Sequence, residues 1–194
     1  MSSLPGYPQT LTINPLARPP RAMIGVPGSK SITNRALVLA ALNSRQAPCS
    51  LSGVLHSEDT EVMVEALGRL GYAIQPYWNE ARIEIGMNQS GRLVPAREAD
   101  LFVANSGTSM RFLTALVALG EGCYRLDGIA RMRERPIQDL LTALAALGVR
   151  AQCDSPNGCP PVTLHANGMA GGSVVIRGDV SSQFLSGLLL AAPW

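Results

Sequence analysis

Three stretches of the chain place hydroxyl, amide and basic side chains directly before an apolar helical pattern. They read PGSKSITNRALVLAAL (27–42), ANSGTSMRFLTALVAL (104–119) and GDVSSQFLSGLLLAAP (178–193). Each polar loop would lie at the N-terminus of a helix, where unpaired backbone N–H groups and a partial positive charge favour anions. The pattern therefore predicts three helix N-termini that could share one small anionic ligand.

The side chains in these stretches suit the same chemistry. Lys30 is the only lysine of the chain, whose other basic residues are all arginine. Its ammonium is a compact charge that can also give and take a proton. Further hydroxyl and guanidinium groups follow at similar positions: Ser31, Arg35, Thr108, Arg111, Ser181 and Ser182. Taken singly, these serines could be ordinary N-caps and the cations ordinary surface charges.

Two other interpretations of the basic motifs are weaker. GVPGSKS lacks the glycine that a P-loop requires before its lysine, because Ser29 stands there. In RMRERP (131–136), Arg131, Arg133 and Arg135 alternate, so an extended backbone would place them on one face. A net charge of +2 and 5% aromatic residues argue against a nucleic-acid surface. The more specific interpretation is an arginine loop that binds a carboxylate or phosphate. The alternative is a solvated loop without a ligand.

A second helical pattern also occurs twice, as TEVMVEALGRLGYAIQ (60–75) and RPIQDLLTALAALGVRAQ (135–152). Leu70-Gly71 and Leu147-Gly148 show that the repeat is about 77 residues long. Each glycine is a candidate C′ residue that ends its helix. In the first copy we expect Asp59 or Thr60 to be the N-cap, and in the second Pro136 to stand in the first turn.

Short strand patterns complete the repeat. They predict single strands at 49–55 and 123–129, and hairpins that join 72–78 to 81–87 and 149–155 to 161–167. The repeating unit is then βαβαββ, which predicts an α/β fold with two units and the opening of a third. The apolar C-terminal helix would expose part of its surface at 184–194, which predicts self-association.

Composition limits the possible partners. The chain has 194 residues, of which 46% are hydrophobic and 15% charged, so we expect a packed globular protein. No secretory signal pattern and no apolar run of about 18 residues occur, so we expect no membrane partner and a cytoplasmic setting. The four cysteines form no CxxC pair and the two histidines lie far apart, so we expect no metal.

Four motifs in this order resemble the 5-enolpyruvylshikimate-3-phosphate synthases: PGSKSITNRALVLAAL, NSGTSMRFLTAL, RMRERPIQDLLTAL and GDVSSQFLSGLLLAAP. The resemblance extends from about residue 10 to residue 194. It implies two globular halves, each of three βαβαββ units, which form the inside-out α/β barrel of the enolpyruvyl transferases. It also implies transfer of the enolpyruvyl group of phosphoenolpyruvate to the 5-hydroxyl of shikimate 3-phosphate, with release of phosphate and without a cofactor. That step lies on the chorismate route to the aromatic amino acids.

The resemblance implies that this chain is truncated. Residues 1–27 would belong to the other, C-terminal half and contain the hinge, and 28–194 would form the N-terminal half. Its units would cover about 28–103, about 104–170 and the start of a third at 171–194. Because the C-terminal half is a necessary partner, we expect the isolated chain to be inactive or nearly so. It could instead be a non-catalytic substrate-binding or complementing fragment.

A related enolpyruvyl transferase that acts on UDP-N-acetylglucosamine is less favoured. It uses a loop cysteine in a Gly-x-Cys-Ala-Ile-Gly pattern, and Cys159 in PNGCPPV lacks that context.

The resemblance also implies residue roles. Shikimate 3-phosphate would contact Lys30, Ser31, Arg35, Ser181, Ser182 and Gln183. Phosphoenolpyruvate would contact Lys30, Gly107, Arg131 and Gln183, and Lys30 would be catalytic. Relatives often carry proline or leucine where this chain has Phe112. The family is inhibited by glyphosate in the phosphoenolpyruvate site, so we expect the intact enzyme to be sensitive, unless Phe112 shifts the Gly107 loop.

Overall fold

The computed structural model describes residues 8, 10–177 and 179–194. The predicted helices are confirmed, with these bounds: α1 Lys30–Asn43, α2 Glu58–Arg69, α3 Gly107–Val117, α4 Gln138–Ala146 and α5 Ser182–Ala191. The strands are β1 Cys49–Ser52, β2 Ile74–Tyr77, β3 Arg82–Ile85, β4 Glu98–Phe102, β5 Glu121–Asp127, β6 Arg150–Cys153 and β7 Val162–Asn167. Short 3-10 helices cover Trp78–Glu80 and Met132–Glu134.

The repeat read from the sequence is visible in the order of the strands. The first sheet has the order β1-β3-β2, and the second has the order β4-β5-β7-β6. Both predicted hairpins are confirmed, because β2 pairs with β3 and β6 with β7 in antiparallel register. In each sheet the second strand of the hairpin also pairs antiparallel with the strand that follows the first helix of the unit. The segment β5-β7-β6 thus repeats β1-β3-β2.

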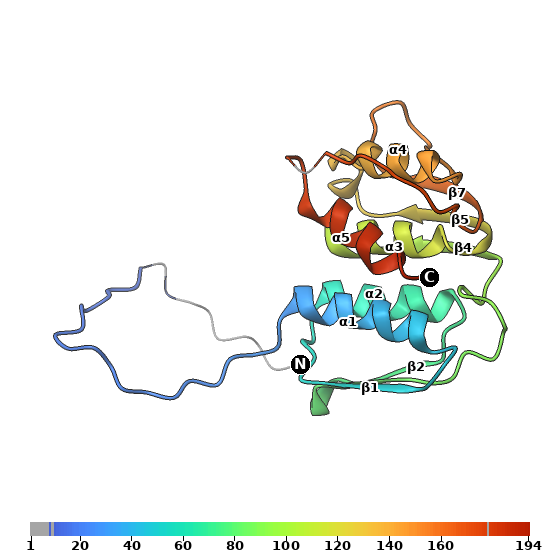
Figure 1. Ribbon diagram of the computed structural model, residues 1–194. Helices are drawn as coiled ribbons and strands as arrows, with labels where there is room; N and C mark the ends of the chain where they lie inside the picture. The colour runs from blue at the N-terminus through green and yellow to red at the C-terminus, as the bar shows by residue number, and fades with distance from the viewer. Residues whose placement is uncertain (1–7, 9, 178) are drawn as a thin grey trace.

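The complete βαβαββ unit occurs in the second copy. Its first strand, β4, pairs in parallel with β5, so by sheet membership this unit begins at Glu98 rather than near residue 104. Residues 10–29, before α1, contain no strand, and neither do residues 171–177, before α5. Residues 10–27 are exposed and irregular, and form the long loop at the left of Figure 1. Gly178, at the start of the third motif, lies outside the described residues.

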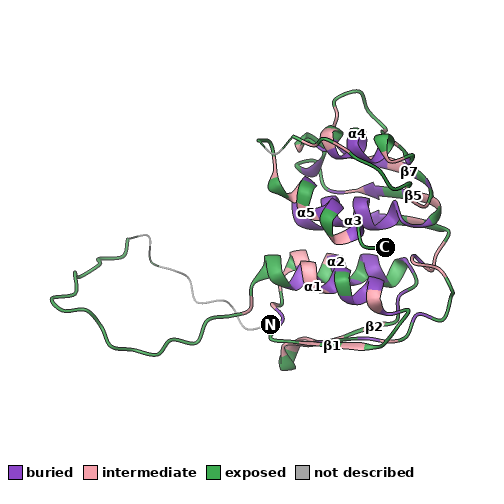
Figure 2. Cartoon of the chain, in the orientation of Figure 1, coloured by how far each residue is buried: buried purple, intermediate pink, exposed green. Residues whose placement is uncertain are grey.

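Helices α1, α2, α3 and α5 form the middle of the molecule, whereas α4 lies above β5 and β7 at the top of Figure 1. In Figure 1, α1 and α2 cover one face of the first sheet, and α3 and α5 lie between them and the second sheet. All 11 residues of α3 are buried (Figure 2). Its apolar side chains join those of the neighbouring helices in one core that includes Leu37, Leu67 and Phe184. Burial of this apolar surface is the main stabilising contribution.

The starts predicted for α2 and α4 both need correction. The N-cap of α2 is Ser57, not Asp59 or Thr60; its backbone N–H donates to Thr60 Oγ1 at 3.0 Å in a capping box. Pro136 lies outside α4, whose N-cap is Ile137. There the N–H groups of Ile137 and Gln138 donate to the carbonyl of Gly158, at 2.9 and 3.2 Å. A tertiary contact therefore sets the start of α4.

The predicted helix ends are confirmed. Gly71 and Gly148 have φ angles of 88° and 85°, in the left-handed region that glycine adopts without strain, directly after the C-caps of α2 and α4.

Two buried tyrosines hold the connection between the units. The hydroxyl of Tyr72, after α2, donates to the Leu93 carbonyl at 2.6 Å. The hydroxyl of Tyr124, in β5, donates to the Ala96 carbonyl at 2.7 Å. Each unit therefore contributes one hydrogen bond to the same connecting segment, which satisfies backbone oxygens that β-structure leaves free.

The outer face of α5 is apolar and partly exposed. Leu185 is 45% exposed and Leu189 61%. A pocket of about 730 Å³ adjoins this face, and Leu147, Met169, Val174 and Trp194 are among the residues that line it. No helix in the described part of the chain is long and apolar enough to span a membrane.

Candidate functional site

Three helix N-termini carry the residues that the sequence singled out, and each begins with a serine cap. Ser29 Oγ accepts from the Ile32 N–H at 3.4 Å, Ser106 Oγ from the Ser109 N–H at 3.3 Å, and Ser181 Oγ from the Gln183 N–H at 3.2 Å. Ser181 is thus the cap of α5 and Ser182 its first residue. A capping hydroxyl still has its proton to donate, so Ser181 can serve the helix and a ligand together.

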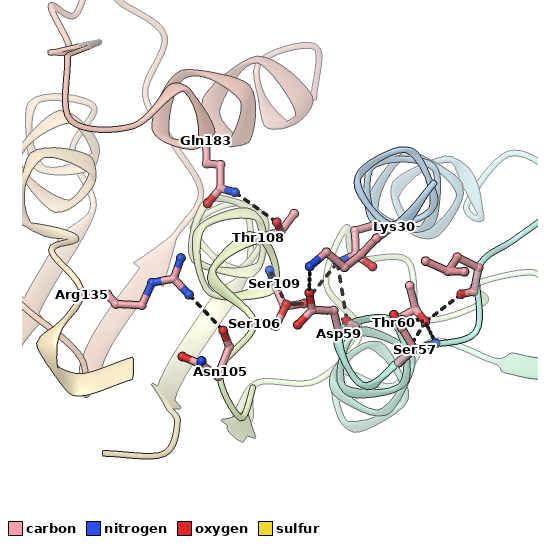
Figure 3. A network of polar contacts seen from close by, with 12 residues as sticks. Lys30, Ser57, Asp59, Thr60, Asn105, Ser106, Thr108, Ser109, Arg135 and Gln183 are labelled. Carbon is pink, nitrogen blue, oxygen red and sulfur yellow. Dashed lines mark hydrogen bonds and ion pairs between the residues drawn. The ribbon is translucent and has the colours of Figure 1, made fainter. Parts of the chain in front are cut away.

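Lys30 forms an ion pair with Asp59 of α2, a partner 29 positions away in the sequence. The side chain of Lys30 is 48% exposed, so its ammonium remains open to solvent and to a ligand. The Asp59 carbonyl oxygen accepts hydrogen bonds from Ser109 Oγ, at 3.2 Å, and from Asn34 Nδ2, at 3.5 Å. Asp59 therefore links α1, α2 and α3 close to their N-termini (Figure 3). No local pattern signals it, because its partners come from other helices.

Arg35 connects α1 with two other helices. Its guanidinium donates to the Ser31 carbonyl at 3.0 Å and to Ser186 Oγ of α5 at 3.3 Å. The same group lies over the ring of Phe112 in α3, 5.1 Å from the ring centroid. Phe112 is fully buried, and its ring supplies an aromatic face to the guanidinium of Arg35.

A second group of side chains surrounds a pocket of about 320 Å³, which we name the arginine pocket. Its lining includes Arg111, Arg131, Glu134, Arg135, Ser181 and Gln183. Gln183 Nε2 also donates to Thr108 Oγ1 at 3.1 Å, which joins the first turns of α5 and α3 (Figure 3). Of the arginines, Arg131 is the most exposed and forms an ion pair with Glu134. A ligand carboxylate or phosphate would compete with Glu134 for Arg131.

Arg111 is the least solvated cation of this pocket. It is 4% exposed and donates to the carbonyls of Gly107, at 3.1 Å, and Pro136, at 2.9 Å. Its Nε is buried without a hydrogen-bond partner. Burial, together with the nearby charge of Arg135, lowers the pKa of Arg111 to about 10. Burying the Arg111 charge without a counter-ion costs free energy. An anion bound in the arginine pocket would lower that cost.

The prediction of three arginines on one face is wrong for Arg133. Residues 132–134 form a 3-10 helix instead of an extended strand, so alternate residues do not share a face. Arg133 instead makes a two-pronged contact with Asp127, at 3.0 and 2.7 Å, while Arg131 and Arg135 line the pocket.

The predicted site residues therefore form two adjoining groups. Lys30, Ser31 and Arg35 belong to α1, whereas Arg131, Ser181 and Gln183 line the arginine pocket. The contacts of Asp59, Thr108 and Ser186 join the two groups across the helices. Cys159 is buried in the connection between β6 and β7.

Solved structures share this fold. EPSP synthase from Acinetobacter baumannii superposes with a TM-score of 0.76 and 26% identity, over 88% of this chain and 38% of that one. The enolpyruvyl transferase NikO from Streptomyces tendae superposes with a TM-score of 0.58 and 18% identity, over 85% and 37%, which supports the fold alone. The architecture is therefore the α/β fold of the enolpyruvyl transferases, built from βαβαββ units.

Sequence comparison identifies the family within this class. The family described as EPSP synthase (3-phosphoshikimate 1-carboxyvinyltransferase) matches residues 18–194, and the chain belongs to it. A 3-phosphoshikimate 1-carboxyvinyltransferase from Opitutus terrae is 47% identical over 188 residues, 96% of this chain and 43% of its own. A 3-phosphoshikimate 1-carboxyvinyltransferase from Nostoc punctiforme is 45% identical over 185 residues, which cover 95% of this chain and 42% of that protein. The chain thus spans less than half the length of these relatives.

Proposed function

We propose that this chain contributes the shikimate 3-phosphate half of an active site that transfers the enolpyruvyl group of phosphoenolpyruvate to the 5-hydroxyl of that substrate. The observation that supports this most strongly is the meeting of three serine-capped helix N-termini around Lys30, Arg35 and the arginine pocket. Both substrates are small polyanions, and helix N-termini with nearby cations suit them. Membership of the EPSP synthase family supports the reaction.

The group on α1 and α5 suits shikimate 3-phosphate. Lys30 and Arg35 would meet its phosphate, with hydroxyl and amide groups from Ser31, Ser181, Ser182 and Gln183. Arg35 is held by Ser186 and the ring of Phe112 in an orientation that a free surface arginine would lack. This preorganisation favours binding, because less side-chain freedom is lost.

Phosphoenolpyruvate would lie closer to α3. The N–H of Gly107, at the first position of that helix, would bind it together with Arg131, Gln183 and Lys30. Arg131 would exchange Glu134 for the ligand. In the reaction, the 5-hydroxyl gives up its proton and adds to C2 of the enol phosphate while C3 takes a proton. The tetrahedral intermediate then expels phosphate from C2 as C3 loses a proton, which re-forms the enolpyruvyl double bond. Lys30 would serve as a general acid or stabilise the charge of the departing phosphate.

The partner implied by this proposal is the C-terminal half of the enzyme. Residues 1–27 would belong to that half, and residues 28–194 to the N-terminal half, with a hinge near Pro27. Groups from both halves must enclose the substrates, so the isolated chain should bind without turnover. Its span of 43% of the Opitutus relative also favours the alternative of a substrate-binding or complementing fragment.

The test is a calorimetric titration of the chain with shikimate 3-phosphate, then phosphoenolpyruvate, followed by a phosphate-release assay. We expect binding without release, and loss of binding in Lys30→Met. Arg150→Gln, which removes an exposed charge on β6, is the matched control. Lys30→Met should unfold at nearly the wild-type urea concentration, because an ion pair whose lysine is half exposed contributes about 1 kcal/mol or less. Normal binding by Lys30→Met would contradict its role, and normal turnover by the chain would contradict the need for a second half.

A further inference from the structure

The guanidinium of Arg135 occupies the space where any other residue at position 107 would place its Cβ. An ideal Cβ on Gly107 would stand 2.6 Å from Arg135 Cζ and closer still to Arg135 Nη2. It would also stand 2.7 Å from Arg111 Nη1. Contacts this short do not occur between real side chains, so one group would have to move. Gly107 has a helical backbone that any residue adopts, so space and not backbone freedom requires glycine here.

Arg135 is held in this position by the loop that it covers. Its Nη1 donates to the carbonyl of Asn105 at 2.9 Å, just before the α3 cap (Figure 3). Arg111 makes the complementary link, because it donates to the Gly107 carbonyl and to the Pro136 carbonyl. The two guanidinium groups thus join the turn 105–107 to residues 135–136 from both sides. That turn sets the direction of the first N–H groups of α3.

We propose that Arg135 is a positioning residue that holds the N-terminus of α3 in its anion-binding orientation by packing on the bare face of Gly107. This inference rests on the proposed function, because that function assigns the Gly107 N–H to phosphoenolpyruvate. The inference is that Arg135 acts through its packing on Gly107. The charge of Arg135 alone would therefore not be enough to orient the N-terminus of α3. A lysine at 135 would keep the charge but lose the planar group that packs on glycine.

The proposal predicts coupling between the two residues. Gly107→Ala would displace the guanidinium and Arg135→Ala would remove it, so each should weaken phosphoenolpyruvate binding about tenfold, equivalent to about 1.4 kcal/mol. In the double variant the methyl group no longer meets the guanidinium of Arg135, and only Arg111 Nη1 remains close to it, at 2.7 Å. The affinity loss of the double variant should therefore be smaller than the product of the two single losses. Arg135→Lys should not restore the affinity.

The experiment measures amide chemical shifts of residues 107 and 108 in the labelled chain, titrated with phosphoenolpyruvate at saturating shikimate 3-phosphate. Urea unfolding of the same variants provides a second double-mutant cycle. Gly25→Ala and Arg150→Ala are the matched controls, since a Cβ at Gly25 meets nothing within 4 Å and Arg150 is an exposed residue of β6 that does not line the arginine pocket. Both should bind and unfold like the wild-type chain.

The outcomes separate the two proposals. Coupled losses in both cycles support positioning by Arg135. Losses that multiply, or recovery in Arg135→Lys, would show that Arg135 acts on the anion by charge and would overturn the inference. A wild-type chain whose residue 107 amide does not respond to phosphoenolpyruvate would contradict the proposed function. In that case the unfolding cycle still decides the packing, and additive changes there would overturn the inference as well.

Discussion

Lys30 and Asp59 form an ion pair between α1 and α2, and the same aspartate accepts hydrogen bonds on its main-chain oxygen from α1 and α3. The carboxylate thus holds the only lysine of the chain at the point where three helices begin. It also places a negative charge beside a proposed phosphate site. Any anionic substrate must share Lys30 with this carboxylate.

Replacing Asp59 by asparagine should strengthen the binding of shikimate 3-phosphate severalfold. The variant keeps the shape and the main-chain oxygen, but it removes a charge that competes for Lys30 and repels phosphate. Calorimetry on the chain measures the affinity, with Glu65→Gln as control because Glu65 pairs with Arg69 on the exposed side of α2. Weaker binding by Asp59→Asn would show instead that the ion pair orients Lys30.

Phe112→Leu should weaken shikimate 3-phosphate binding several-fold and reduce stability by about 1–2 kcal/mol. The ring is fully buried, so a smaller side chain leaves unfilled volume in the core. It also supports the Arg35 guanidinium, and cation–π contacts contribute about 0.5–2 kcal/mol. Calorimetry and urea unfolding measure the two effects. Unchanged affinity in a destabilised variant would show that Arg35 does not depend on the ring.

Stability should fall above pH 10, in part through Tyr72. Burial, with the nearby Tyr124 phenol, raises the pKa of Tyr72 far above its ordinary value of about 10. The unfolded chain therefore loses this proton first, so the stabilisation is complete below pH 10 and declines as pH rises beyond it. Tyr72→Phe should flatten this decline in urea titrations between pH 8 and about 11.5.

At neutral pH the same variant should lose about 1–3 kcal/mol, since the Leu93 carbonyl is left without its partner. Tyr77→Phe is the control, because Tyr77 is only partly buried. An equally steep alkaline decline in Tyr72→Phe would exclude Tyr72 as its source.

The chain should self-associate through the outer face of α5. Leu189 is 61% exposed beside the apolar pocket, and replacing it by glutamine should shift the sedimentation profile toward monomer. Leu39→Gln, which changes an exposed leucine of α1, should leave the profile as it is. A monodisperse wild-type monomer would contradict the prediction.

Local patterns were enough to predict the repeat, the helices, the hairpins and the two C′ glycines. Each depends on periodicity or on a backbone preference that acts over a few residues. The start of α4 was not predictable in this way, because the Gly158 carbonyl that accepts its first N–H groups comes from a distant loop. The predicted position of Arg133 was wrong for a related reason, because the 3-10 helix directs its side chain toward Asp127.

The same distinction applies to the candidate site. The motifs indicated which residues carry charge and hydroxyl groups near helix N-termini. They carried no information on the partners that orient those groups, such as Asp59 for Lys30 or Phe112 for Arg35. The contact between Arg135 and Gly107 was also not predictable, because it forms only when two separate loops pack against each other.

The complete burial of α3 has a consequence for how a ligand is received. A surface helix can shift or fray when a charge arrives at its end, and that reorientation reduces the gain from the interaction. The residues of α3 are enclosed by the core on every turn. Its N–H groups are therefore oriented during folding, and they can meet a developing negative charge with little reorganisation of the protein.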